Sequence, residues 1–257
     1  MPRVDGAWAR FGYALATLGL GPLLIWQGRQ VRRDTPRLPE PPGERSGLTG
    51  CGPLLRLLIL GDSSAAGVGA PHQRMALSGQ LTAVLAHHHT LQWRLRATTG
   101  HTLGDVLKCV AQAPVEHFDV VVVAVGVNDA TGRTRMAAWR QGLVRLVSLI
   151  QARHAPRLIL MSRLPPVHAF PALPQPLRWY LGWRSKQLSA AKMAVLADHP
   201  LCEVAAVEFP IEPSFMAEDG FHPGPPAYTM WARHLASLIR RRMQVVRADA
   251  PHARPEG

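Results

Sequence analysis

The chain has 257 residues, and its 47% apolar and 18% charged composition excludes an intrinsically disordered protein and allows one α/β domain with additional segments. Twenty-nine Lys and Arg against 17 Asp and Glu give a formal charge of +12, which could attract nucleic acid, anionic lipid or acidic substrates. No nucleic-acid-binding motif accompanies the charge, so we predict no nucleic-acid partner. The three cysteines lack the spacing of a metal site or a redox pair.

The first element in chain order is a strongly apolar segment, Phe11–Trp26. It is shorter than the roughly 20 residues that cross a bilayer comfortably, and no signal-peptide cleavage site follows it. A short membrane anchor, a helix in the lipid interface and a helix packed on the domain are the open interpretations. We assign residues 1–33 as a hydrophobic anchor segment and expect membrane association. Four arginines after the segment, against two before it, favour the cytoplasmic side, with the periplasmic face as the alternative.

Residues 34–53 are rich in proline and glycine and show no periodicity, so we predict a linker. From Leu54 onward, short apolar runs alternate with longer amphipathic stretches. The runs predict parallel strands covered on both faces, at Leu54–Leu60, Leu91–Ala97, Val120–Val125, Leu158–Met161 and Cys202–Val207. The amphipathic stretches predict helices at Met75–His88, Leu103–Val110, Thr134–Arg153, Leu177–Ala197 and Ala227–Met243.

This alternation predicts the α/β class and right-handed crossover connections. We expect a three-layer α/β/α sandwich around a mainly parallel, five-stranded sheet, spanning residues 54–246. Residues 247–257 are polar and contain two prolines, so we expect a flexible tail.

A candidate nucleophile, Ser63, follows the first predicted strand directly after Gly61 and Asp62. Parallel sheets place their chemistry at this carboxyl edge, but a serine there needs a base. Asp219 and His222 are three residues apart, so one turn of chain can bring them together. The carboxylate can then accept one imidazole N–H and leave the other ring nitrogen facing Ser63. The alternative for Ser63 is an ordinary helix cap.

Two further polar groups follow predicted strands. Gly100 comes after the second apolar run, and Asn128 comes after the third, within Gly126-Val127-Asn128-Asp129. A glycine permits close backbone approach, and an asparagine amide can point across the sheet edge. An ordinary turn glycine and a turn asparagine are the alternatives. The proline-rich stretch 163–177 could form a wall or lid of a site, or a packed surface loop.

These blocks, in this order, resemble the SGNH (GDSL-type) hydrolase family of bacterial serine esterases and lipase-like enzymes. The matching residues are Gly61-Asp62-Ser63, Gly100, Gly126-Val127-Asn128-Asp129 and Asp219-Gly220-Phe221-His222-Pro223, and the resemblance covers roughly residues 54–243. It implies a flavodoxin-like hydrolase fold. It also implies catalytic roles for Ser63 as nucleophile, His222 as base and Asp219 as the orienting carboxylate.

The resemblance further implies an oxyanion hole built from the Ser63 and Gly100 backbone N–H groups and the Asn128 side chain. The expected reaction is hydrolysis of a small-molecule or lipid acyl ester through an acyl-enzyme, without a metal or an organic cofactor. Two other functions stay open: an acyltransferase that uses the same site, and a membrane-tethered binding protein with an inactive hydrolase fold.

Overall fold

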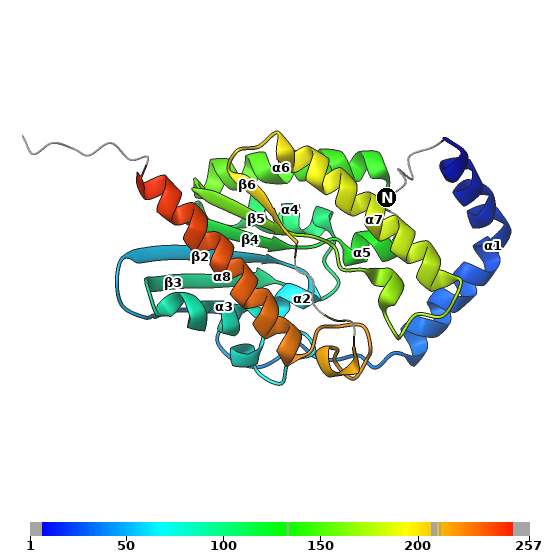
Figure 1. Ribbon diagram of the computed structural model, residues 1–257, viewed down its shortest axis with the longest axis horizontal. Coiled ribbons are helices and arrows are strands. Elements are labelled where there is room, and N and C mark those ends of the chain that lie inside the picture. The colour runs from blue at the N-terminus through cyan, green and yellow to red at the C-terminus, as the bar shows by residue number, and fades with distance from the viewer. Residues whose placement is uncertain (1–6, 133, 207–209, 211, 249–257) are drawn as a thin grey trace, which may run out of the picture.

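The structure is a computed structural model that describes residues 7–132, 134–206, 210 and 212–248. Over these residues the chain forms one six-stranded sheet with the order β1-β3-β2-β4-β5-β6 (Figure 1). Only β1, at the edge, is antiparallel to its neighbour among the described strands. The strands are β1 (Ser46–Thr49), β2 (Leu54–Gly61), β3 (Thr90–Ala97), β4 (Val120–Ala124), β5 (Leu158–Ser162) and β6 (Cys202–Ala205).

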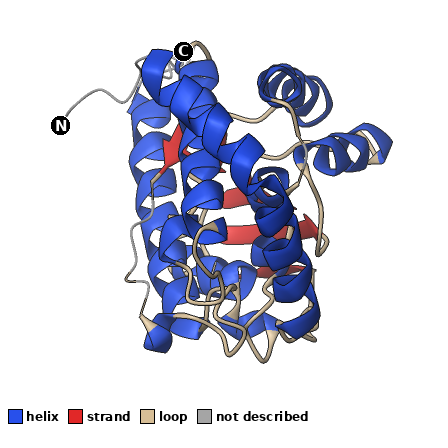
Figure 2. Cartoon of the chain, turned by 90° about the vertical axis from the view of Figure 1, so that its right-hand side faces the viewer, coloured by secondary structure: helices blue, strands red, loops and turns tan. Residues whose placement is uncertain are grey.

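Helices cover both faces of this sheet, as the view in Figure 2 shows. They are α1 (Ala7–Asp34), α2 (Ser63–Ala66), α3 (Leu77–Ala86), α4 (Leu103–Gln112), α5 (Val127–Thr131), α6 (Met136–His154), α7 (Leu177–Ala197) and α8 (Pro225–Ala248). Short 3-10 turns occur at Gln73–Met75, Val167–Ala169 and Pro213–Phe215.

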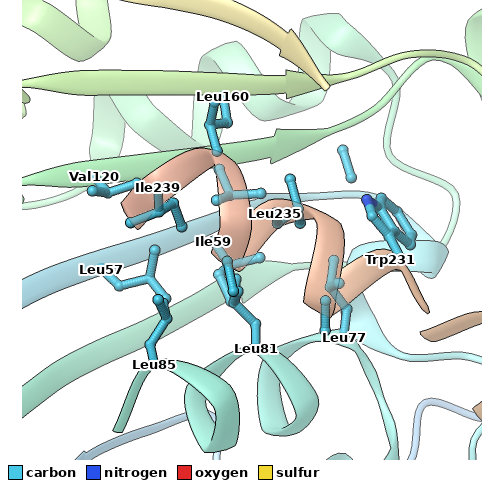
Figure 3. Close-up of a cluster of buried hydrophobic side chains, with 14 of the residues drawn as sticks. Leu57, Ile59, Leu77, Leu81, Leu85, Val120, Leu160, Trp231, Leu235 and Ile239 are labelled. Atoms are coloured by element: carbon cyan, nitrogen blue, oxygen red, sulfur yellow. The ribbon is translucent and has the colours of Figure 1, made fainter. Parts of the chain in front are cut away.

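Successive residues of the central strands enter two different cores because strand side chains alternate between faces. Leu57 and Ile59 of β2 pack with α3 and α8, and Figure 3 shows them among side chains of those helices. Leu58 and Leu60 enter the other core, with α4, α6 and α7. This arrangement confirms the predicted three-layer α/β fold.

The predicted number of strands was wrong, because β1 lies inside the segment 34–53 that we assigned as a linker. Its four residues pair with β3, from Ser46 opposite Arg94 to Thr49 opposite Leu91. All four β1 residues are exposed, so the strand shows no apolar alternation that the sequence could reveal. An edge strand of this kind is held by backbone hydrogen bonds to its neighbour rather than by side-chain burial.

The residues before β1 also lie along the domain. The Glu40 carboxylate accepts hydrogen bonds from the Thr99 backbone N–H at 2.7 Å and from the Thr99 hydroxyl at 2.9 Å. The Pro42 carbonyl accepts from the backbone N–H of Gln73 at 2.9 Å. Proline-rich composition indicated a spacer, but these long-range contacts attach the segment to the turn after β3 and to the 3-10 turn at Gln73–Met75.

Helix α1 contains the apolar segment Phe11–Trp26, and its second half packs on the domain. Leu24 is buried in a small third core with Phe170 and Leu177. One turn later, the Gln27 amide donates to the Gln175 carbonyl at 2.6 Å and accepts from the Leu177 backbone N–H at 3.1 Å. Of the three interpretations, packing on the domain therefore describes this half of the helix.

Among the described residues, no helix combines the length and apolar character that crossing a bilayer requires. At the other end of the chain, α8 continues to Ala248, so residues 247 and 248 of the predicted tail are helical. Val207, in the last predicted strand, and residues 249–257 lie outside the described residues.

Candidate active site

Ser63 lies at the carboxyl end of the central strand β2, where the chain turns directly into α2. A Cβ atom at Gly61 would lie 2.0 Å from the Ala124 carbonyl oxygen, so the tight approach of β2 to β4 requires glycine. Asp62 caps α2: its carboxylate accepts from the Ser64 backbone N–H at 3.0 Å and from the Ser64 hydroxyl at 2.7 Å. The sharp turn therefore fixes the Ser63 side chain at the sheet edge.

His222 and Asp219 come from the loop between β6 and α8, 159 residues away in the chain from Ser63 for His222. The His222 Nε2 atom lies 2.9 Å from Ser63 Oγ, and Nδ1 lies 2.6 Å from Asp219 Oδ2. An ionised carboxylate can only accept, so the proton of the neutral imidazole belongs on Nδ1. Nε2 is then free to accept the proton of the Ser63 hydroxyl.

Asp219 is held by the backbone of the loop that it orients. Its Oδ1 atom accepts from the backbone N–H groups of Phe221 and His222, each at 2.9 Å. Burial raises the pKa of this carboxyl, but the hydrogen bonds from the His222 ring and from the two backbone groups outweigh burial, so the net pKa is below its ordinary value. The carboxylate therefore stays ionised beside the imidazole.

Helix α8 ties this loop to the chain that follows the nucleophile. The buried Tyr228 hydroxyl donates to the Val68 carbonyl at 2.7 Å, and burial raises the pKa of that phenol well above its ordinary value. Within the loop, the Phe221 ring meets the His222 ring edge to face, with 5.3 Å between the ring centroids. This ring contact and the Asp219 hydrogen bond both hold the imidazole in place beside Ser63.

The other two predicted site residues lie beside one another. Asn128, at the start of α5, donates from its side-chain amide to the His101 carbonyl at 2.9 Å. Gly100, next to His101, is exposed, has a positive φ of 86° and has nothing near its missing Cβ. Neither residue has a hydrogen bond to the Asp219–His222–Ser63 chain in the described structure.

A cavity of about 400 Å³ begins at Ser63 and His222. Its wall comes in large part from the proline-rich stretch after β5, including Leu164, Pro165, Pro166 and Phe170. Of the alternatives left open for that stretch, the wall of a site is the one that this geometry supports. Over the described residues, no group of three or more His, Cys, Asp or Glu side chains is placed to hold a metal ion.

Lys192 is a buried charged residue that the sequence motifs did not point to. Lys192 of α7 is 1% exposed and lies behind the sheet edge that carries the site. A signal was present in the sequence, because Lys192 is four residues from both Leu188 and Leu196 and so shares their core-facing stripe.

Comparison with known proteins decides the family. The profile of the GDSL-like lipase/acylhydrolase family matches residues 59–230, which include Ser63, Asn128 and the Asp219–His222 loop. The chain belongs to this family. As a GDSL-like hydrolase it is an enzyme that acts on ester bonds, as the sequence motifs predicted.

Two curated relatives carry esterase names. The chain is 29% identical over 259 residues to the GDSL-like esterase Rv1075c of Mycobacterium tuberculosis, a match covering 91% of this chain and 81% of that protein. It is 27% identical over 190 residues to an arylesterase of Vibrio mimicus, covering 72% and 88%. The similarity to Rv1075c therefore extends beyond the residues of the family match.

A solved structure supports the fold independently. The psychrotrophic esterase EstA from Pseudoalteromonas sp., in a structure inhibited by monoethylphosphonate, superposes with a TM-score of 0.57 at 18% identity. The match covers 74% of this chain and 98% of EstA. At this identity the likeness concerns the fold of this GDSL-like hydrolase and not its substrate.

Proposed function

We propose that this GDSL-like hydrolase cleaves carboxylic acyl esters by covalent catalysis at Ser63. The observation that carries the proposal is the hydrogen-bonded chain from Asp219 through His222 to Ser63, located where the apolar cavity begins. A serine hydroxyl is a weak nucleophile by itself and becomes reactive when a positioned base removes its proton. His222 is that base, and Asp219 orients it.

In the first half of the reaction, His222 Nε2 takes the Ser63 proton while Oγ attacks the ester carbonyl. The imidazolium then returns the proton to the leaving alcohol oxygen, and the acyl group stays on Oγ. In the second half, His222 removes a proton from water, and the resulting hydroxide oxygen attacks the acyl-enzyme carbonyl. The bond between the acyl carbon and Ser63 Oγ then breaks, the imidazolium returns its proton to Oγ, and the free acid leaves. The buried Asp219 carboxylate stabilises the imidazolium in both halves.

The developing negative oxygen needs donors on the side of the carbonyl away from the base. The Ser63 backbone N–H lies in the first turn of α2, where helical N–H groups have no intrahelical acceptor. Asn128 uses one amide hydrogen for His101 and retains a second. With Gly100 beside His101, these three groups form the proposed oxyanion hole.

The apolar lining of the cavity favours an ester substrate whose acyl group is an apolar chain. Its size is within the range of small-molecule sites, and side chains such as Val125, Leu164, Phe170 and Met216 line it. Each methylene buried there contributes about 0.8 kcal/mol relative to water. We therefore favour a fatty acyl ester over an acetylated sugar.

A phosphonate probe tests the covalent step. The full-length protein, treated with a fluorophosphonate, is expected to gain one phosphonyl group and to lose esterase activity in proportion. Peptide mapping by mass spectrometry should find the group on Ser63. The fatty acid should be the main product of ester turnover. Labelling of another residue, or turnover that survives stoichiometric labelling, would contradict the proposal, and preferential transfer to an added alcohol would favour the acyltransferase alternative.

We also propose that the enzyme associates with an anionic membrane surface through α1, on the cytoplasmic side that the arginine bias favours. Leu23, Ile25 and Trp26 on the second half of α1 are 39%, 56% and 59% exposed. Arg29 and Arg32 follow on the same helix and are exposed. A helix lying in the interface binds through buried apolar area together with attraction between its basic residues and anionic lipid.

Vesicle sedimentation checks this surface. Full-length protein is expected to pellet with vesicles that contain phosphatidylglycerol and less so with neutral phosphatidylcholine vesicles. The triple variant Leu23→Ser, Ile25→Ser, Trp26→Ser should stay in the supernatant. The control variant Leu48→Ser changes a leucine on β1 that is more exposed, at 70%, and it should sediment like the wild type. Equal sedimentation of wild type and triple variant would contradict the proposed surface.

A further inference from the structure

Lys192 is a buried ammonium that the proposed reaction does not use directly. Its Nζ atom donates to the Val125 carbonyl at 3.0 Å and to the Ser162 carbonyl at 2.8 Å, and it lies 5.5 Å from the centroid of the Trp139 ring. Burial lowers the pKa of this amine to about 8, while the Asp62 and Asp129 carboxylates oppose the change. Burying a charge is costly unless it has partners, so this position calls for an explanation.

The two carbonyls lie just beyond the last paired residues of β4 and β5. The β4–β5 ladder ends at the pair Val123 and Met161. Beyond this pair, Val125 and Ser162 both line the cavity that begins at Ser63. Lys192 therefore bridges the two strand ends just past the last point at which the sheet itself joins them.

Each strand end leads directly into a part of the proposed site. Val125 is followed by Gly126 and then by α5, which carries Asn128. Ser162 is followed by Arg163 and Leu164 in the cavity wall. A shift of either strand end would move the residues that it carries.

Trp139 links the lysine to the same turn. Its ring lies next to the Lys192 ammonium, and a Cβ at Gly126 would meet the ring at 2.9 Å and Leu164 at 3.0 Å. Gly126 also has a positive φ of 135°, a backbone conformation that residues other than glycine rarely adopt. The turn between β4 and Asn128 is therefore tightly packed, so its position depends on the strand end that Lys192 holds.

We propose that Lys192 is a positioning residue, whose ammonium holds the ends of β4 and β5 at the separation that places Asn128 for oxyanion stabilisation. This inference rests on the proposed function, in which Asn128 stabilises the oxyanion. Around the amine, the charged groups are Asp62 before α2 and Asp129 in α5, which carry the opposite charge. Trp139 of α6 contributes the face of its ring.

A double-mutant cycle between Lys192 and Asn128 tests the inference. Lys192→Met keeps the length of the side chain but removes its donors and charge. The assay uses p-nitrophenyl butyrate, and rates are divided by the concentration of active sites titrated with the phosphonate probe. Relative to the wild type, Lys192→Met should lower kcat about tenfold and leave KM nearly unchanged. A lost transition-state interaction has this effect. Asn128→Ala alone should lower kcat by about 10²–10³-fold. In the Asn128→Ala background, Lys192→Met should cost less than about twofold, because coupled residues are not additive.

Two more variants complete the design. Lys108→Met makes the same substitution at a lysine whose side chain is 74% exposed, and it should leave kcat unchanged. Lys192→Arg keeps the charge, but its planar guanidinium does not reproduce the geometry of the ammonium. It should show the same dependence on Asn128, which keeps the cycle measurable if Lys192→Met accumulates poorly.

The outcomes separate the inference from the function on which it rests. If Lys192→Met lowers only the melting temperature and leaves kcat per titrated site at the wild-type value, Lys192 is merely structural. If the two substitutions are additive, Lys192 does not act through Asn128. Both results overturn the inference and leave the Ser63 mechanism intact. If Asn128→Ala itself leaves kcat unchanged, the proposed oxyanion hole fails, and the inference fails with it.

Discussion

Replacing Ser63 with alanine is expected to abolish turnover of p-nitrophenyl esters while the protein remains folded. The hydroxyl oxygen is the atom that attacks the carbonyl in the proposed mechanism, and it lies 2.9 Å from His222 Nε2 at the cavity. Loss of the serine from such a triad costs on the order of 10⁶ in kcat. Because Ser63 contributes only one hydroxyl at a partly exposed position, the melting temperature should change little.

Initial rates and thermal melts of Ser63→Ala, measured beside Ser148→Ala, check this expectation. Ser148 is an exposed serine on α6, and its substitution should leave both quantities at their wild-type values. Ser64 is the neighbouring hydroxyl, and it donates to the Asp62 carboxylate. Turnover that persists in Ser63→Ala but disappears in Ser64→Ala would show that the nucleophile was assigned to the wrong serine.

Asp219→Asn is expected to lower kcat by about 10⁴-fold, the loss found when a triad aspartate becomes an amide. The amide oxygen can still accept from the Phe221 and His222 backbone N–H groups, so the loop should keep its shape. The amide NH₂ group, however, would face His222 Nδ1 and favour the tautomer with the proton on Nε2. That tautomer cannot accept the Ser63 proton.

Glu218 offers the matched control, because it is the carboxylate next in the chain to Asp219 and is exposed. Glu218→Gln should retain wild-type kcat/KM from acid to neutral pH. A damaging Glu218→Gln together with a mild Asp219→Asn would assign the orienting role to Glu218.

We also expect the difference in stability between the wild type and Asp219→Asn to depend on pH. Because the folded protein lowers the pKa of this carboxyl below the ordinary 3.8, its ionised form stabilises the fold above that value. This contribution is lost as pH falls through the lowered pKa. Denaturant unfolding should therefore show wild type more stable than Asp219→Asn near neutral pH, with the difference shrinking below about pH 4. A difference that does not vary with pH would contradict the linkage.

Local pattern was sufficient for much of this protein. Parallel strands buried on both faces are continuous apolar runs, and β2 and β4 were recognisable for that reason. Ser63, Asn128 and the Asp219–His222 pair each follow or adjoin a predicted element in a motif of the family. Their order in the chain was enough to predict the class of enzyme, because these residues must meet at one edge of the sheet.

Other features depend on contacts between distant segments, and the sequence alone did not reveal them. The edge strand β1 has four exposed residues, so only its pairing with β3 makes it a strand. The apolar stripe of α1 could face lipid or protein equally well, and its packing beside Leu177 became visible only in the structure. In each case the deciding free energy comes from a partner far away in the chain.

Lys192 shows the same limit at the site itself. The sequence predicts a lysine on the buried face of α7, but it does not reveal that the carbonyls at the ends of two strands accept hydrogen bonds from this lysine. Apolar periodicity and turn motifs are local, and so the sequence by itself determined the α/β class, the order of the strands along the chain and the candidate triad. Only the tertiary structure determined that β1 is a sixth strand, that α1 packs on the domain and that Lys192 joins the ends of β4 and β5. Burial and hydrogen bonding between residues remote in sequence exist only in the folded chain.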